Sequence, residues 1–248
     1  MLLVAKKLFR NWYLYPIVYF KLTKKSHVVF ETRNGLKISL RVNSTDLMAL
    51  THVWLIQEYH YSEFKIRNDD VILDIGAHIG LFSLHASQFC KNGRIFCFEP
   101  IKENFEELEK NIKINNITNI IPFNLAVSNT TKKIKIYLND DESGHSMFLE
   151  NSEFVEVDSI SIDDIFVKYG IENCNFLKLD CEGAEYEIID LLSKNNLKKI
   201  EKTVIEYHMA DSKPNLLENL KNTLKNNSFK FEIKPLFSDI GFIYALKS

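Results

Sequence analysis

The segment VILDIGAHIG, residues 71–80, decides the fold of this chain. Its apolar start ends at an aspartate, two glycines follow, and an amphipathic segment begins directly afterwards. An apolar run that passes through glycines into a helical pattern predicts a buried strand, a tight turn and a helix. The chain has only 8 glycines in 248 residues, well below the roughly 7% of average proteins. Two glycines in this turn therefore indicate a place where the backbone needs them.

An acidic residue follows the next apolar run. Residues 94–98 predict a second strand, and Glu99 and Pro100 come directly after it. Glu99 lies about twenty residues beyond Gly80, the spacing at which an acid accepts hydrogen bonds from a ribose. We therefore predict a nucleoside cofactor here, with Gly76 letting the ligand approach the backbone and Gly80 letting the helix pack closely on its strand. The alternative is an ordinary turn with an incidental acid.

The details of the turn favour one class of nucleoside. A dinucleotide loop normally carries a third glycine and binds a pyrophosphate. This turn has two glycines, and the charge of the preceding Asp74 would oppose a pyrophosphate. A cofactor with a sulfonium and an ammonium group, and without phosphate, suits that charge. S-Adenosylmethionine is therefore the predicted cofactor, and a nicotinamide cofactor is the alternative.

Apolar runs and amphipathic segments alternate from residue 67 to the end of the chain. The predicted strands are residues 71–73, 94–98, 120–125, 175–179, 202–207, 229–233 and 241–246. The helical segments include residues 81–91 and the stretches around 105–112, 184–192 and 217–224. Such alternation is typical of parallel sheets with right-handed crossovers, so we predict one doubly wound α/β domain over residues 67–248.

Two further strands interrupt the alternation. Residues 132–138 and 154–160 predict a β-hairpin insertion whose polar loop covers residues 139–151. A short helix is expected from Ser161, because Asp164 three residues later completes a capping box.

Residues 1–66 predict an extension that covers the main domain. Asn34-Gly35 predicts a two-residue hairpin turn between strands 27–33 and 36–42, and a helix is expected from Thr45. The uncharged run 11–20 is too short for a bilayer span, which needs about twenty residues. Cations and aromatic side chains surround this run, so it either packs on the domain or a partner subunit, or lies on an anionic membrane.

Composition excludes several classes of protein. With 31 Lys and Arg against 33 Asp and Glu, the formal net charge is -2, which argues against a nucleic-acid partner. The 4 cysteines form no C-x-x-C pair, which argues against a zinc site and predicts reduced thiols in a cytoplasmic protein. No secretory signal is expected.

An ordered set of motifs resembles the FkbM-like methyltransferases. The matching stretches are residues 71–80, 98–100, 124–128, 178–185 and 205–208, within roughly residues 66–209. The resemblance implies a Rossmann-like class I fold and an S-adenosylmethionine-dependent methyltransferase acting on hydroxyl groups of sugars, glycolipids or secondary metabolites. It implies that the cofactor is contacted by Asp74, Gly76, Ala77, His78, Gly80, Glu99, Pro100, Asn124 and Ala126. His78 stands where the family more often has asparagine.

The predicted catalytic residues follow the fourth and fifth strands, where ligands of open α/β sheets bind. They are Asp180, Glu182, Glu206 and His208. His208 is the predicted base because imidazole titrates near neutral pH, Asp180 would orient the hydroxyl, and Glu206 would fix the imidazole tautomer or bind a substrate hydroxyl. The alternatives are a satisfied strand-end histidine for His208 and helix N-terminal electrostatics for Glu182 and Glu185.

The predicted function is O-methylation of a small hydroxylated acceptor, first of all a sugar, glycan or glycolipid. A NAD-dependent oxidoreductase and a catalytically silent cofactor-binding scaffold are the alternatives. No metal is predicted, although Asp180, Glu182 and Glu206 offer oxygen ligands suited to Mg²⁺. Residues 143–146 either reach over the crevice and shape the acceptor site or form a solvated hairpin connection.

Overall fold

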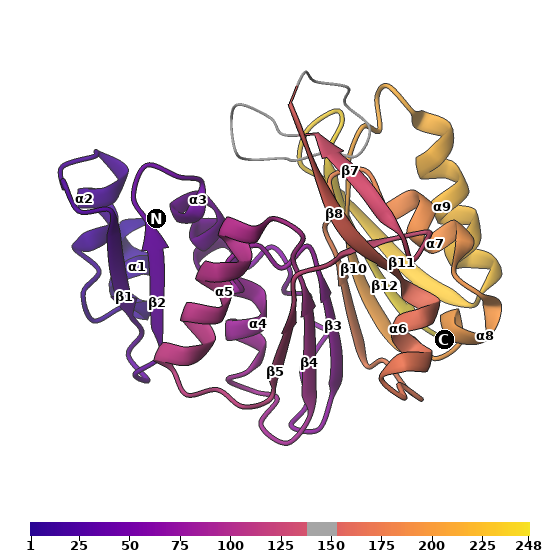
Figure 1. Cartoon of the computed structure of the whole chain (residues 1–248), viewed down its shortest axis with the longest axis horizontal. Coiled ribbons are helices and arrows are strands. Elements are labelled where there is room, and N and C mark those ends of the chain that lie inside the picture. The colour runs from indigo at the N-terminus through magenta and orange to yellow at the C-terminus, as the bar shows by residue number, and fades with distance from the viewer. Residues whose placement is uncertain (138–152) are drawn as a thin grey trace.

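The computed structural model describes residues 1–137 and 153–248. The loop prediction for residues 143–146 lies outside the described residues. Figure 1 shows a central sheet with helices on both sides and the N-terminal elements, in indigo, at one end of the molecule.

The central sheet has seven strands in the order β11-β12-β10-β9-β3-β4-β5. Their bounds are β3 Val71–Ile75, β4 Arg94–Phe98, β5 Ile120–Phe123, β9 Phe176–Leu179, β10 Lys202–Tyr207, β11 Phe229–Pro235 and β12 Gly241–Lys247. Neighbours from β5 to β10 run parallel, whereas β12 runs antiparallel to both β10 and β11. The predicted α/β architecture is confirmed, with a mixed rather than wholly parallel sheet.

Helices cover both faces of this sheet. The helices of one side are α4 (Leu81–Ala86) and α5 (Lys102–Ile114), and those of the other are α6 (Ile162–Lys168), α7 (Glu185–Leu191), α8 (Lys194–Leu197) and α9 (Pro214–Asn226). Successive residues of a strand point to opposite faces, so Ile72 packs in the core beneath α4 and α5, and Leu73 in the core beneath α7 and α9. The sheet is therefore doubly wound.

Helix α4 ends at Ala86 rather than at Lys91 as predicted. The chain must turn back early because Gly93 passes close to the turn that precedes β3: a Cβ at Gly93 would lie 2.0 Å from the carbonyl oxygen of Asp70. The backbone N–H groups of Asn92 and Gly93 both donate to the carbonyl of Asn68.

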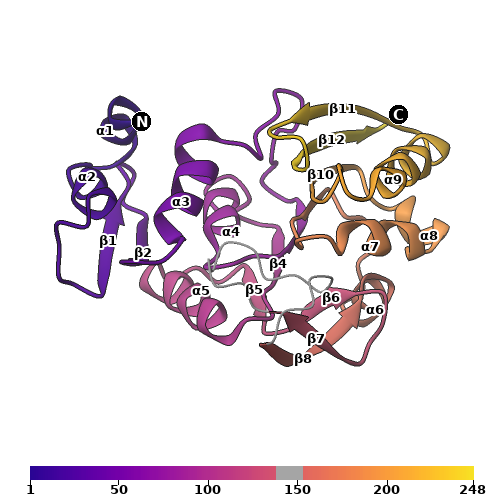
Figure 2. The same cartoon turned by 90° about the horizontal axis from the view of Figure 1, so that it is seen from above.

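The insertion is a small three-stranded sheet in the order β6-β8-β7, beside the main sheet in Figure 2. Its strands are β6 (Ala126–Ser128), β7 (Lys133–Tyr137) and β8 (Phe154–Ser161). The antiparallel pairing of β7 and β8 agrees with the predicted hairpin. The predicted strand 120–125 is shorter, because β5 ends at Phe123 and the chain crosses to β6. The Oγ of Ser161 accepts from the backbone N–H of Asp164 at 3.1 Å, as predicted for a cap.

The N-terminal elements pack on the α4 and α5 side. They are α1 (Leu2–Leu8), α2 (Leu14–Tyr19), β1 (His27–Glu31), β2 (Lys37–Arg41), α3 (Asp46–Leu50) and the π-helical turn η1 (Thr51–Ile56). The predicted hairpin is present, with His27 opposite Arg41. Phe9, Phe30 and Trp54 are buried in one core with Ile72, so the first segment packs on the domain. Among the described residues, no helix is both long and apolar enough to cross a bilayer.

Candidate active site

A cavity of about 920 Å³ lies at the carboxyl ends of β3, β4, β9 and β10. Six predicted cofactor residues line it: Gly76, Ala77, His78, Glu99, Pro100 and Ala126. All four predicted catalytic residues line it as well: Asp180, Glu182, Glu206 and His208. The fold therefore brings most of the predicted cofactor residues and all of the predicted catalytic residues into one crevice. Its volume is near the upper end of the roughly 300–1,000 Å³ of small-molecule sites.

The two glycines of the turn serve contacts within the protein. Gly76 has φ +77°, and a Cβ there would lie 1.7 Å from the carbonyl oxygen of Asp180. The segment after β9 therefore requires a glycine here, and the predicted approach of the ligand to the same turn stays a prediction. Gly80 has φ +84° and lies outside the cavity lining, and its Cβ would lie 3.1 Å from Leu108 on α5. It allows close packing of helix against helix, not helix against strand.

Asp74 is fully buried and does not line the cavity. Its carboxylate accepts a hydrogen bond from Ser83 Oγ at 2.7 Å and lies 3.4 Å from Lys178 Nζ. Its predicted contact with the cofactor therefore stays a prediction. Asp74 helps to hold Lys178 under the turn.

Glu99, the acid predicted to bind a ribose, is buried. Its carboxylate accepts from the backbone N–H groups of His78 at 2.8 Å and Ile101 at 3.0 Å. Burial raises the pKa of Glu99 to about 7. Asn124 does not line the cavity, because its amide donates to the carbonyls of Glu99 and Pro100 at 2.9 and 3.0 Å. It fixes the turn that carries Glu99, and its predicted contact with the cofactor stays a prediction.

His78 occupies the left-handed backbone region, with φ +50°. Asparagine and histidine are enriched among the residues that adopt this conformation. The imidazole Nε2 lies 3.7 Å from Asp46 of α3. Burial lowers the pKa of His78 to about 4, so the ring is neutral at physiological pH.

Tyr59 is a site residue that the sequence did not reveal. It follows η1 in the N-terminal extension and lines the cavity. Its hydroxyl lies 2.8 Å from Asp180 and 3.0 Å from Glu206. A phenol has one hydrogen to donate, so one of the two carboxyl groups must carry a proton for both contacts to be hydrogen bonds.

That proton belongs to Glu206. Burial raises the pKa of Glu206 to about 8. The pKa of Asp180 is lowered: burial opposes this, but the charges of Lys178, whose Nζ lies 3.3 Å away, and of His208, together with the hydrogen bonds from Tyr59 and Lys178, outweigh it. Protonated Glu206 therefore donates to the hydroxyl of Tyr59, which donates to Asp180. Lys178 also donates to the carbonyl of Gly76 at 2.5 Å and so faces the site.

His208 lies between two carboxylates. Its Nδ1 donates to Glu185 at 2.8 Å, and its Nε2 lies 3.4 Å from Glu182. Although burial opposes protonation, the hydrogen bond to Glu185 and the nearby negative charges raise the pKa of His208 to about 10. The imidazole is thus a cation at neutral pH and cannot accept a proton there, which disfavours it as the predicted base.

Glu182 and Glu185 occupy different environments. Glu182 lines the cavity with 31% of its side chain exposed, and burial of the rest raises its pKa to about 7. Glu185 is fully buried and accepts from the backbone N–H groups of Cys181 and Gly183 at 3.0 and 2.7 Å. It holds the turn after β9 and positions His208, whereas Glu182 is open to a ligand.

One ligand atom each from Asp180, Glu182 and His208 lies within 4.8 Å of the others. These donors could hold a divalent cation. A metal at His208 Nε2 would have to displace a proton from a group with a pKa of about 10, and metal binding at neutral pH is weakened by such competition.

Residues 74–239 match the model of the methyltransferase FkbM domain. The chain belongs to this family. The hexuronic acid methyltransferase AglP of Haloferax volcanii is 23% identical over 169 residues, which cover 65% of this chain and 69% of AglP. The AMB antimetabolite synthetase AmbE of Pseudomonas aeruginosa is 23% identical over 208 residues, 68% of this chain but 10% of AmbE. This chain therefore spans about a tenth of the length of AmbE.

A solved structure shows the same fold. The fibrillarin pre-rRNA processing protein of Methanococcus jannaschii superposes with a TM-score of 0.52 at 13% identity, covering 90% of this chain and 84% of that one. The FkbM-domain chain therefore has the Rossmann-like class I methyltransferase fold, and its methyl donor is S-adenosylmethionine. The buried carboxylate of Glu99 at the cavity wall fits that donor, since it can accept hydrogen bonds from a ribose.

Proposed function

We propose that this FkbM-domain methyltransferase transfers the methyl group of S-adenosylmethionine to a hydroxyl group of a sugar, either free or within a glycan or glycolipid. The observation that carries the proposal is the polar wall opposite Glu99. Asp180, Glu206 and Tyr59 form a connected hydrogen-bond chain there, and Glu182 lies beside it. Such a set of carboxyl and hydroxyl groups can bind several hydroxyl groups of a saccharide. The name of the relative AglP, a hexuronic acid methyltransferase, supports this acceptor class.

The reaction requires an in-line arrangement and a proton acceptor. The new O–C bond forms as the C–S bond breaks, the electron pair of that bond stays on sulfur, and the hydroxyl proton must leave. A general base works best with a pKa near the working pH. Glu182 has such a pKa, about 7, so we assign the proton to its carboxylate in place of His208.

The other predicted residues keep supporting roles in this proposal. Asp180 remains an anion beside Lys178 and accepts a hydrogen bond from a neighbouring hydroxyl group of the sugar, which orients the attacking oxygen. Glu206 carries a proton and can donate it in a hydrogen bond. His208, held by Glu185, fixes the position of Glu182. On the donor side, Glu99 binds the ribose and the turn 76–78 lies along the nucleoside.

We also propose that the N-terminal segment contacts an anionic membrane. Residues 1–30 contain no Asp or Glu. Phe20 and Leu22 are 64% and 72% exposed and alternate with the exposed Lys21, Lys24 and Lys25. Exposed apolar and cationic side chains on one short segment are typical of peripheral membrane binding. A protein bound at a membrane would be close to a glycolipid acceptor.

Mass spectrometry of acceptors incubated with S-adenosylmethionine tests the sugar proposal. We expect a gain in mass of one CH₂ group on a hexuronic acid or a related saccharide, with the methyl group on oxygen. Glu182→Gln should abolish the gain, and Asp190→Asn, at an exposed acid near the end of α7, should leave it intact. Methylation of nitrogen or carbon on a non-sugar acceptor, with saccharides untouched, would overturn the proposal.

A further inference from the structure

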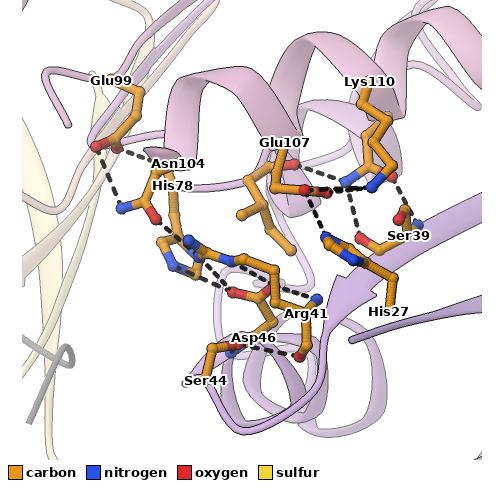
Figure 3. Close-up of polar contacts among 12 residues, drawn as sticks. His27, Ser39, Arg41, Ser44, Asp46, His78, Glu99, Asn104, Glu107 and Lys110 are labelled. Atoms are coloured by element: carbon orange, nitrogen blue, oxygen red, sulfur yellow. Dashed lines mark hydrogen bonds and ion pairs between the residues drawn. The ribbon is translucent and has the colours of Figure 1, made fainter. Parts of the chain in front are cut away.

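A series of polar contacts connects the N-terminal extension with Glu99, the acid that we expect to bind the ribose (Figure 3). Arg41, the last residue of β2, donates from Nη2 to Asn104 Oδ1 at 2.8 Å. Asn104 on α5 lies 3.4 Å, through Nδ2, from Glu99 Oε1. Residue 41 and residues 99–104, which are far apart in the sequence, are thus connected through Asn104. Asn104 also lines the cavity.

Asp46 holds Arg41 in place from the opposite side. The guanidinium donates to both carboxylate oxygens of Asp46, at 3.1 and 2.7 Å, and the backbone N–H of Arg41 donates to the same side chain at 2.7 Å. Asp46 is fully buried. A buried ion pair of this kind adds little to stability compared with apolar packing, so its position next to the site calls for another explanation.

The orientation of an amide supplies that explanation. The side chain of asparagine can turn either its carbonyl or its NH₂ group toward a neighbour. Because Arg41 carries only donors, it fixes the carbonyl oxygen of Asn104 toward the extension. The NH₂ group then has to face Glu99, where it stabilises the carboxylate. With the amide reversed, the carbonyl oxygen would face Glu99 and repel it.

The Arg41–Asp46 pair also lies near the turn at His78. Asp46 Oδ1 lies 3.7 Å from His78 Nε2, and the backbone N–H of His78 donates to Glu99 Oε2. Each oxygen of Glu99 thus has a neighbour that is in turn next to the Arg41–Asp46 pair. Figure 3 shows Arg41 and Asp46 close to His78 and Asn104, with Glu99 beyond them.

We propose that Arg41 and Asp46 are positioning residues for the methyl donor: by fixing the amide of Asn104 and the turn at His78, they hold the Glu99 carboxylate ready for the two ribose hydroxyls. The extension before β3 is then a part of the donor site. This inference rests on donor binding and not on the sugar acceptor, so the two proposals can fail separately.

Calorimetric titration with S-adenosylhomocysteine and its 2′-deoxy analogue tests the inference on the full chain. Arg41→Lys keeps the charge next to Asp46 but loses the planar, two-sided donor geometry. We expect it to weaken binding of S-adenosylhomocysteine about tenfold and to reduce the preference for the ribose over the deoxyribose form. Asn104→Leu should do the same, and Arg41→Lys should add nothing in the Asn104→Leu background.

A neighbouring contact provides the matched control. Glu107 of α5 joins the same extension, since it lies 2.7 Å from His27 and 3.0 Å from Lys110. Glu107→Gln removes this charge from the interface without touching Glu99, and we expect its affinity and its ribose preference to match those of the unmodified chain. A merely structural role for the interface would instead make both variants behave alike.

Unchanged affinity and ribose preference in folded Arg41→Lys would overturn the inference, and so would full additivity with Asn104→Leu. If Arg41→Lys fails to fold, Asp46→Asn replaces it in the experiment. This substitution keeps the packing and weakens the interaction with the guanidinium of Arg41. A folded Asp46→Asn variant with unchanged affinity and preference would overturn the inference equally.

Discussion

At the scale of single residues, neighbouring acids of the crevice differ in their protonation. Burial places the pKa of Glu182 at about 7 and that of Glu206 at about 8, while Asp180 is kept ionised by Lys178 against the effect of burial. The motifs predicted these acids and their common crevice. They could not predict their protonation, which depends on burial and on Tyr59 and Lys178 as neighbours. For the same reason, the sequence could not show that Glu185 accepts a hydrogen bond from His208, the residue predicted as the base.

The pH dependence of methyl transfer reports the state of Glu182. Below its pKa of about 7 the carboxyl group is protonated and cannot accept the hydroxyl proton. We therefore expect kcat to fall about tenfold per pH unit below pH 7 and to level off above it. Glu182→Gln should lose at least about 100-fold in kcat at pH 7.5, with Asp190→Asn as the control. An acidic limb centred near pH 4 would argue against this assignment.

Tyr59→Phe removes one hydroxyl and leaves the ring in place. Asp180 then loses a donor and Glu206 an acceptor. We expect kcat to fall by about 10- to 100-fold, while the dissociation constant of S-adenosylhomocysteine stays within about twofold.

Tyr61→Phe is the matched control for Tyr59→Phe. The hydroxyl of Tyr61 donates to Glu232 at 2.7 Å, and Tyr61 lies outside the cavity lining. Steady-state kinetics of the two variants side by side checks the prediction. Equal rates in both would show that the chain through Tyr59 has no part in the reaction.

At the scale of elements, the apolar runs predicted the sheet well. The strand at Lys202–Tyr207 has the predicted bounds, because most of its residues are β-branched or aromatic, the types that favour strands. Helix α4 and strand β5 end earlier than predicted, since their ends are set by contacts with distant segments. Asp74 shows the same limit, because the sequence could not show its hydrogen bond with Ser83 and its ion pair with Lys178.

The turn after β3 should tolerate no side chain at its first glycine. Gly76→Ala would place a methyl group 1.7 Å from the carbonyl of Asp180 in a left-handed backbone conformation. We expect a loss of several kcal/mol in the free energy of unfolding, measured by urea denaturation.

Gly35→Ala provides the comparison for Gly76→Ala. Gly35 also has positive φ, +92°, but a Cβ there meets nothing within 4 Å. We expect a cost of only about 1 kcal/mol, due to the backbone conformation alone. Similar losses at the two positions would mean that the approach of β9 to the turn does not constrain Gly76.

At the scale of the whole molecule, the extension before β3 contributes directly to the cavity. Thr45, Met48 and His52 line it together with Tyr59. The sequence predicted these elements as a cover and gave no sign of a role in the site. No motif joins Tyr59 to Asp180 or Arg41 to Asn104, because the partners lie far apart along the chain and meet only when the extension packs on the domain.

The proposed membrane contact belongs to this scale too. Sedimentation with vesicles should pull down the protein when the vesicles contain phosphatidylglycerol and not when they contain phosphatidylcholine alone, and high salt should weaken the binding. Lys21→Glu combined with Lys24→Glu should abolish it. The same charge change at the exposed Lys194 and Lys230 is the control. Binding that depends on neither pair nor on lipid charge would contradict the contact.

The central claim is that the crevice beyond the ends of β3 and β4 binds the methyl donor. A crystal structure of the chain with S-adenosylhomocysteine tests it most directly. We expect the nucleoside to lie beside residues 76–78, with both ribose hydroxyls within hydrogen-bond distance of Glu99. Density for the nucleoside at another surface, with this crevice empty, would contradict it.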